Sequence, residues 1–191
     1  MKKHAFLAVL GLAASVASSY GQGFIAFDSY SANLGAGAVA TLNGIPLNGS
    51  FHTDLYYALG TVSDPVNDGL SYSSSSDPAP SFTDLGVTGV AFSDGYFQGP
   101  TVIIPSYVNG PVSFEVVAFN GSSYESSTIR GRSGAFTESM IVNSASFPAT
   151  LFGDNGPGMP EIVIVVPEPT TLALAGFGGL VALAAFRRKQ S

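Results

Sequence analysis

Tight-turn signals recur along most of this chain and divide it into short apolar stretches. Asparagine or aspartate stands directly before glycine in seven pairs: Asn43-Gly44, Asn48-Gly49, Asp68-Gly69, Asp94-Gly95, Asn109-Gly110, Asn120-Gly121 and Asn155-Gly156. Asparagine, aspartate and glycine tolerate the positive φ angles that the tight turns of β-hairpins need. A chain interrupted in this way has little room for helices, so we expect short strands joined by hairpins.

Eight stretches between these turns have the composition of β-strands: 24–30, 38–42, 51–59, 86–92, 101–104, 112–119, 136–142 and 161–166. In the third, apolar residues alternate with His52, Asp54 and Tyr56, which predicts a half-buried strand. No window between residues 22 and 165 keeps the 3.6-residue apolar period of a helix, and prolines interrupt most candidates. We predict an all-β fold, an antiparallel β-sandwich of jelly-roll or immunoglobulin-like type, with a small closed barrel as the alternative.

The first 21 residues have the three-part order of a secretory signal peptide. Lys2 and Lys3 open the chain, an apolar run covers residues 5–16, and small residues follow. The small residues allow cleavage after Ala17 or after Gly21, and we favour Gly21. The run is short for a helix that crosses a bilayer, which needs roughly 20 residues, so an uncleaved anchor is the less favoured alternative. We expect residues 22–165 to form one secreted domain.

Charge is divided unevenly between the body of the chain and its ends. Residues 22–165 contain Arg130 and Arg132 as their only bases, against twelve acidic residues, which gives a net charge of −10. Nucleic-acid backbones are bound through clustered lysine and arginine, so we predict no nucleic-acid partner. The chain also lacks cysteine, so no disulfide stabilises it in an oxidising compartment.

The last 26 residues, VPEPTTLALAGFGGLVALAAFRRKQS, combine three features in a fixed order. Pro167-Glu168-Pro169 hold the backbone extended and keep a helix from starting earlier. The uncharged run 170–186 would measure about 26 Å as a helix, which is marginal for a hydrocarbon core of about 30 Å. Arg187-Arg188-Lys189 follow, and such residues stay on the cytoplasmic side of a membrane. We therefore expect a single C-terminal transmembrane helix over 170–186, with the body on the outer side.

This order resembles the PEP-CTERM sorting signal of Gram-negative bacteria, and the resemblance covers residues 166–191 only. It implies that Pro167-Glu168-Pro169 form the sorting motif, that Arg187-Arg188-Lys189 stop the segment in the inner membrane, and that an exosortase is a partner. It also implies a transient stay in the inner membrane, then a cell-surface or extracellular destination, often together with exopolysaccharide. The same tail is sometimes labelled an ice-binding protein C-terminal domain, which describes the tail and not the body. Residues 22–27, the Asn-Gly hairpins and the stretch LYYALG look similar to small surface proteins of Verrucomicrobia-type bacteria.

Few residues of the body are suited to catalysis or to metal binding. His52 is its single histidine and lies close to Asp54, but no Gly-x-Ser-x-Gly elbow accompanies them, and Gly131-Arg132-Ser133-Gly134 falls short of one. A multi-histidine or cysteine zinc site is excluded by composition. The oxygen-rich loops 64–69 and 153–156 leave Ca²⁺ open, although such loops are more often plain turns. We predict no enzyme activity and no resident cofactor or metal.

Aromatic residues leave a second function open. Six tyrosines of the body are candidates for stacking on sugar rings: Tyr56, Tyr57, Tyr72, Tyr96, Tyr107 and Tyr124. The cores and rims of β-sandwiches are also rich in tyrosine, so this composition alone does not decide. We expect a structural or adhesive role in an exopolysaccharide or biofilm matrix. A surface carbohydrate-binding module is the alternative, and a small secreted hydrolase is the less favoured third possibility.

Overall fold

The computed structural model describes residues 21–30, 40–64, 78–87 and 90–166. These ranges contain no α-helix and the following strands: β1 (Gly23–Asp28), β2 (Ala40–Leu42), β3 (Ile45–Pro46), β4 (His52–Leu59), β5 (Thr83–Asp84), β6 (Val90–Ser93), β7 (Tyr96–Ile104), β8 (Val112–Phe119), β9 (Arg130–Arg132), β10 (Phe136–Glu138) and β11 (Ile162–Ile164). No helix in the described ranges is long and apolar enough to cross a membrane. Residues 1–20 of the predicted signal peptide and the predicted helix over 170–186 lie outside the described residues.

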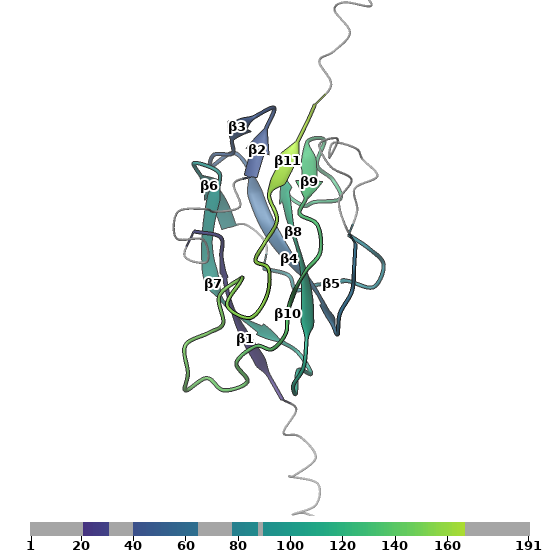
Figure 1. Ribbon diagram of the computed structural model, residues 1–191. Coiled ribbons are helices and arrows are strands. Elements are labelled where there is room, and N and C mark those ends of the chain that lie inside the picture. The colour runs from purple at the N-terminus through teal and green to yellow at the C-terminus, as the bar shows by residue number, and fades with distance from the viewer. Residues whose placement is uncertain (1–20, 31–39, 65–77, 88–89, 167–191) are drawn as a thin grey trace, which may run out of the picture.

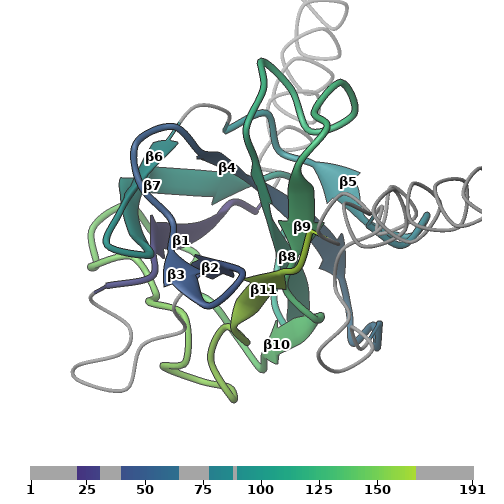
Figure 2. The same ribbon diagram turned by 90° about the horizontal axis from the view of Figure 1, so that it is seen from above.

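Two sheets enclose the interior. The larger has the strand order β1-β7-β6-β4-β8-β10, with β5 beside β4 and β9 beside β8, and its pairs are antiparallel. The smaller has the order β11-β2-β3 and includes a parallel pair, β11 with β2. Seen from above, the large sheet curls, and β2, β3 and β11 lie between its β1–β7 side and its β8–β10 side (Figure 2). The predicted all-β, mainly antiparallel class is confirmed, and the finer jelly-roll or immunoglobulin-like type stays a prediction.

Two of the predicted turn signals close tight hairpins. Asn43 and Gly44, between β2 and β3, have φ angles of 51° and 78°. Asp94 and Gly95, between β6 and β7, have φ angles of 51° and 82°. Positive φ at both central residues is the geometry of a type I′ turn, whose twist matches that of the flanking strands. The turn at Asp94 and Gly95 joins β6 to β7 as a hairpin, and so sets which side chains share the outer face of that hairpin.

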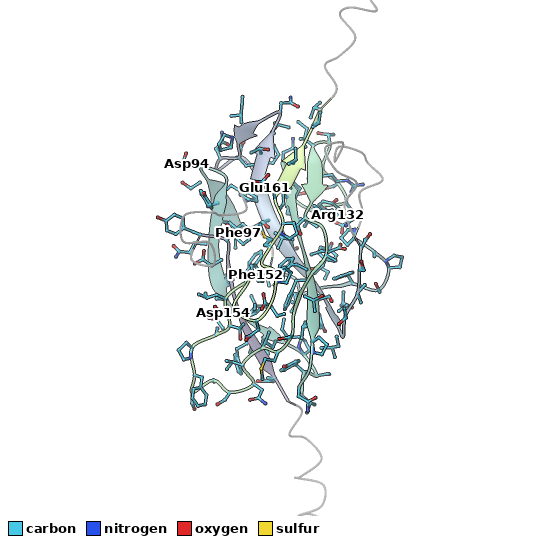
Figure 3. The ribbon with its side chains drawn as sticks, viewed as in Figure 1. Asp94, Phe97, Arg132, Phe152, Asp154 and Glu161 are labelled. Atoms are coloured by element: carbon cyan, nitrogen blue, oxygen red, sulfur yellow. The ribbon has the colours of Figure 1, made fainter. Side chains whose placement is uncertain are left out.

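The main core lies between the two sheets and is centred on aromatic rings. Phe152, which belongs to no strand, packs its ring at centroid distances of 5.0 Å from Phe136, 5.8 Å from Phe114 and 6.3 Å from Phe27. Figure 3 shows Phe97 and Phe152 in the interior of the body. Aromatic contacts of this kind add to the large apolar area that each ring buries. The loop that carries Phe152 is thus tied to both sides of the curled sheet.

The outer face of β4 and β8 is also covered, so the prediction of a half-buried strand at 51–59 is wrong. A second apolar cluster packs there: Tyr56, Ala58, Phe82, Val117, Phe119 and Tyr124. Two polar side chains of β4 on this face, Asp54 and Tyr56, have hydrogen-bond partners. Asp54 Oδ1 accepts hydrogen bonds from the N–H groups of Leu55 and Val87, and the Tyr56 hydroxyl donates to Glu125 Oε1 at 3.3 Å. The bond from Val87 also ties the residues that follow β5 to β4, with which both β5 and β6 pair.

Candidate functional site

The predicted sorting motif and basic end, Pro167-Glu168-Pro169 and Arg187-Arg188-Lys189, lie outside the described residues, and β11 leads directly to them. β11 pairs in parallel with β2 and buries Ile162 and Ile164 completely. Beyond it, the Val166 N–H donates to Asn43 Oδ1 at 3.0 Å. The start of β1 and the end of β11 lie at opposite ends of the body (Figure 1). The chain therefore leaves the domain toward the tail at the end farthest from its first strand.

The six tyrosines predicted as sugar-stacking candidates lie in different environments. Tyr56, Tyr107 and Tyr124 are buried, with exposed fractions of 8%, 2% and 3%, so their faces are not available to a ligand. Tyr57 is half-buried and packs against the main core. Tyr72 lies outside the described residues. Tyr96 differs from these, because it lines an open groove on the outer face of the β6–β7 hairpin.

This groove, the β6–β7 groove, has a volume of about 470 Å³ and is lined by Tyr30, Ala91, Ser93, Asp94, Tyr96, Phe97 and Gln98. Its floor is formed by small side chains, because Ala91 and Ser93 point outward from β6 while Phe92 between them is buried. One wall is aromatic: the rings of Tyr30 and Tyr96 meet at 90° with centroids 5.6 Å apart. The groove volume falls within the range of small-molecule sites, roughly 300–1,000 Å³.

A single buried carboxylate, Asp28, accepts hydrogen bonds from two residues of the β6–β7 groove. Asp28 is 6% exposed, and its Oδ1 accepts the Tyr30 N–H at 2.7 Å. Its Oδ2 accepts Gln98 Nε2 at 3.3 Å, across the β1–β7 pair. Binding groups held by a buried hydrogen-bonded neighbour are oriented before a ligand arrives. Tyr30 was not among the predicted sugar-stacking candidates; it was assigned to the predicted strand 24–30 and lies instead in the turn after β1.

His52 lies on β4 and packs against Phe119, with ring centroids 6.1 Å apart. Its Nδ1 is buried without a hydrogen-bond partner, while Oδ1 of nearby Asp54 is occupied by two backbone N–H groups. Ser133, in the stretch that came nearest to a nucleophile elbow, accepts the Val116 N–H through its hydroxyl at 3.0 Å. The described geometry therefore gives these residues packing and backbone contacts and does not join them into a triad.

A buried acid on β8 was missed by the sequence analysis. Glu115 has no exposed surface, and its Oε1 accepts a hydrogen bond from Arg132 Nη1 at 3.3 Å. Arg132 Nη2 also pairs with Asp64 Oδ2 at 3.2 Å. Burial raises the pKa of Glu115 to about 8, although Arg132 opposes the rise. Raised pKa values are common in catalytic acids. Glu115, however, lines neither the β6–β7 groove nor the groove beside Tyr107.

The loop 153–156, one of the two candidate calcium loops, is closed around a carboxylate of the protein itself. Glu138 is fully buried, and it accepts the N–H groups of Gly153 and, at 2.8 Å, Asn155. Asp154 Oδ2 accepts the Leu151 N–H at 2.7 Å. Backbone N–H groups directed at an anion are the opposite of the oxygen cage that Ca²⁺ requires. Of the other candidate loop, 64–69, only Asp64 is described, and no group of three metal-binding side chains occurs within the described residues.

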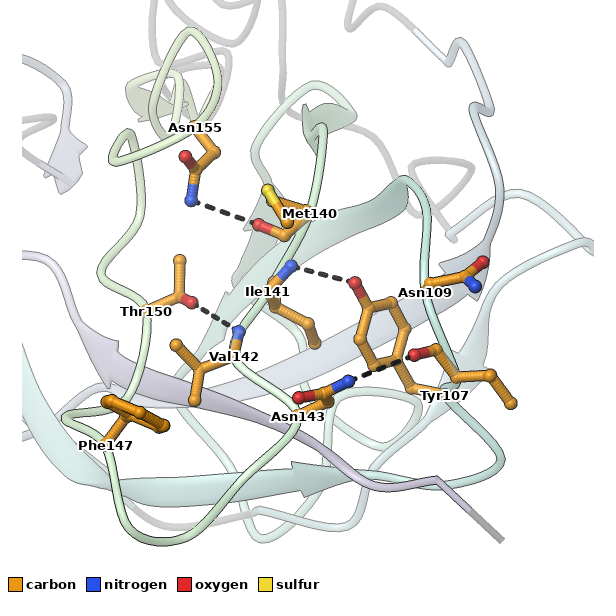
Figure 4. A pocket seen from close by; sticks show the side chains of 10 residues that line it. Tyr107, Asn109, Met140, Ile141, Val142, Asn143, Phe147, Thr150 and Asn155 are labelled. Carbon is orange, nitrogen blue, oxygen red and sulfur yellow. Dashed lines mark hydrogen bonds between the residues drawn. The ribbon is translucent and has the colours of Figure 1, made fainter.

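A second groove of about 280 Å³ lies beside Tyr107 (Figure 4). Its rim carries exposed apolar side chains: Val108, Met140 and Phe147, with exposed fractions of 62%, 57% and 66%. Beneath them, Tyr107 is fixed by two hydrogen bonds, one to the Gly110 carbonyl at 3.1 Å and one from the Ile141 N–H at 3.0 Å. Phe147 offers an exposed ring that lies outside the β6–β7 groove, which makes it a useful control.

Comparison with known proteins gives a match over the tail of the chain. Residues 165–189 match the family model described as the PEP-CTERM protein-sorting motif. No curated protein and no solved structure matches the chain. The match begins at Val165, one residue after β11 ends. The motif implies an exported protein that is sorted by an exosortase to the cell surface or the extracellular space.

Proposed function

We propose that residues 22–165 form a non-catalytic surface domain with a structural or adhesive role in an exopolysaccharide or biofilm matrix. The observation that supports this most directly is the sorting motif at 165–189, which implies export by an exosortase system. In this proposal the apolar run 170–186 holds the protein transiently in the inner membrane. Exosortase then acts on the tail at Pro167-Glu168-Pro169, and the domain continues outward.

The arrangement of the body suits such a role. β11 ends next to the motif, while β1 begins at the far end (Figure 1). A domain tethered through its tail would therefore direct the second groove, beside Tyr107, away from the membrane. The acidic body also favours solubility in an extracellular setting.

A carbohydrate-binding module is the second candidate, and the β6–β7 groove is the observation that favours it. Among the predicted sugar-binding tyrosines, Tyr96 lies there beside exposed Tyr30. The two candidates are compatible, since a matrix protein that binds polysaccharide is also adhesive. Neither the ice-binding label nor the likeness to Verrucomicrobia-type surface proteins has support beyond the sequence patterns that suggested it.

The sorting proposal is tested by intact mass spectrometry of the protein recovered from the cell surface and medium of the producing bacterium. We expect the residues after about Pro167 to be lost, and we expect this loss to require the exosortase. The matched control is the same strain with the exosortase gene deleted. A C-terminus that runs through Ser191 in both strains would overturn the proposal, because the tail would then be a permanent anchor.

A further inference from the structure

We propose that the β6–β7 groove binds a neutral polysaccharide segment, with one ring of the perpendicular pair Tyr30–Tyr96 stacking on a sugar ring, the other flanking it, and Gln98 bonding its hydroxyls. This inference rests on the proposed function, because export brings the groove into contact with extracellular glycans. The two can fail separately, since glycan binding is measured on purified protein and sorting is measured by mass.

The aromatic wall supplies the apolar contact that a sugar ring needs. Tyr30 is 65% exposed, and its ring meets the ring of Tyr96 at a right angle, so the pair forms an aromatic corner that is open to solvent. A pyranose ring has an apolar face formed by C–H groups, and an aromatic side chain with a polar tip fits both that face and its wet surroundings. The small floor residues Ala91 and Ser93 leave room for the ring beside the tyrosines.

Gln98, two residues from Tyr96 on β7, supplies hydrogen bonds beside the aromatic pair. Gln98 is exposed, and Asp28 occupies Nε2 of its amide. A primary amide has two N–H donors and a carbonyl acceptor, so one donor and the acceptor remain to face the groove. Sugar hydroxyls both donate and accept, and a fixed planar amide can serve two neighbouring hydroxyls. Buried Asp28 accepts hydrogen bonds from both the Gln98 amide and the backbone N–H of Tyr30, so it links these two residues of the groove.

The charge of the domain selects a neutral glycan over an acidic one. The body has two basic residues, Arg130 and Arg132, and both are engaged internally. Arg130 Nη1 donates to the Tyr124 carbonyl at 2.9 Å and lies 4.8 Å from the centroid of that ring, while Arg132 pairs with acidic side chains. Asp94 adds a carboxylate to the groove lining. An acidic polysaccharide would meet carboxylates without a compensating cation.

The test is affinity electrophoresis of the full chain in native gels that contain one polysaccharide each: hydroxyethyl cellulose, dextran, laminarin or alginate. The chain is kept in lauryldimethylamine oxide, a detergent without a sugar headgroup, because of its apolar tail. We expect retardation in at least one of the three neutral gels and none in alginate. Absence of retardation in all neutral gels, or retardation in alginate alone, would overturn the proposal.

Variants then locate the binding surface. We expect Tyr30→Ala and Tyr96→Ala each to raise the dissociation constant about tenfold, which corresponds to about 1.4 kcal/mol, and Tyr96→Phe to keep most of the affinity. Gln98→Ala should weaken binding by a smaller factor. Phe147→Ala is the matched control, since it removes an exposed ring outside the groove. Tyr30 is the decisive position, because its exposed side chain can be removed without opening the core. Unchanged retardation of Tyr30→Ala, or equal loss in Phe147→Ala, would place binding elsewhere and refute the assignment.

Discussion

The stability of this domain should depend on pH through one buried acid, Glu115. Its side chain has no exposed surface, and its Oε2 is buried without a hydrogen-bond partner. Burial raises the pKa of Glu115 from the ordinary 4.5 to about 8, against the opposing effect of Arg132. Between these two pH values the folded protein keeps a proton that the unfolded chain has released. The protonated form of Glu115 therefore contributes its full stabilisation of the folded state below pH 4.5. This contribution falls as the pH rises above 4.5 and is lost once the pH has passed through about 8.

The size of the effect follows from the two pKa values. Where the folded state holds one more proton than the unfolded state, the free energy of unfolding falls by about 1.4 kcal/mol for each unit by which the pH rises. Applied to Glu115, a shift from 4.5 to about 8 gives a loss of about 2.5 kcal/mol between pH 5 and pH 7. That is a large fraction of the roughly 5–15 kcal/mol by which domains are stable.

Glu115→Gln is the variant that isolates this contribution. Glutamine has the shape of the protonated acid, and its carbonyl oxygen can still accept the hydrogen bond from Arg132 Nη1. It cannot ionise, so the variant has no proton to lose between pH 5 and pH 8. We expect the variant to match the wild type at pH 5 and to exceed it by about 2–3 kcal/mol at pH 7.

Urea unfolding of the full chain at pH 5, 6, 7 and 8, followed by tyrosine fluorescence and far-UV circular dichroism, measures the difference. The chain has no tryptophan, so tyrosine is the natural probe. Glu161→Gln, at an exposed position, controls for the change in net charge. If the free energies of unfolding of the wild type and Glu115→Gln run parallel from pH 5 to pH 8, the reasoning is refuted.

Three further predictions concern the loop that carries Phe152. Phe152→Ala should lower the free energy of unfolding by about 3–5 kcal/mol, because its ring packs against the rings of Phe136 and Phe114 in the core. Phe147→Ala, at an exposed position, should change the free energy of unfolding little, and urea midpoints measure both effects. Glu138→Ala should cost about 1.5–3 kcal/mol and speed amide hydrogen exchange at Gly153 and Asn155, and unchanged exchange at both would contradict the anchor role. Addition of EDTA should leave the melting temperature of the wild type unchanged, and a fall reversed by Ca²⁺ would show that calcium is bound after all.

β4 and β8 could be predicted from the sequence, whereas β9 and the two-residue strands could not. The prediction of 112–119 coincides with β8, and 51–59 contains β4, since both are bounded by turn residues. β9 was missed because Arg-Gly-Arg has neither alternation nor strand propensity, and it forms a strand only because β8 pairs with it. β3 and β5, of two residues each, are equally dependent on their neighbours. One glycine and one proline within β7, Gly99 and Pro100, hid its first half, where Gly99 approaches Phe27 too closely to accept a side chain.

The candidate site was predicted only in part, for a different reason. Tyrosine content suggested sugar binding, but spacing along the chain does not show which rings a second apolar layer will cover. Tyr124 is buried by its contact with Phe119 at 6.3 Å and by Arg130 above its ring. Asp28 gave no signal in the sequence, because its role depends on Gln98, which lies opposite it in the register of β1 with β7. Such long-range pairs exist only once the sheet has formed.

The junction between domain and tail limits where processing can occur. β11 ends at Ile164 and the sorting match begins at Val165. Ile162 and Ile164 are fully buried, and removal of side chains of this size from the core costs about 1.5–3 kcal/mol each. Cleavage within or before residues 162–164 would therefore disrupt a strand of the small sheet and destabilise the domain that is being exported.

We accordingly expect the mature C-terminus to lie at or beyond Val165. Chains truncated after Val166 should keep the urea midpoint of the full chain, whereas chains truncated after Glu161 should lose several kcal/mol of stability. Mass spectrometry of the secreted protein gives the natural end point. A mature C-terminus at or before Glu161 on a protein that remains folded would show that β11 is dispensable, and the assigned role of the parallel β11–β2 pair would then be wrong.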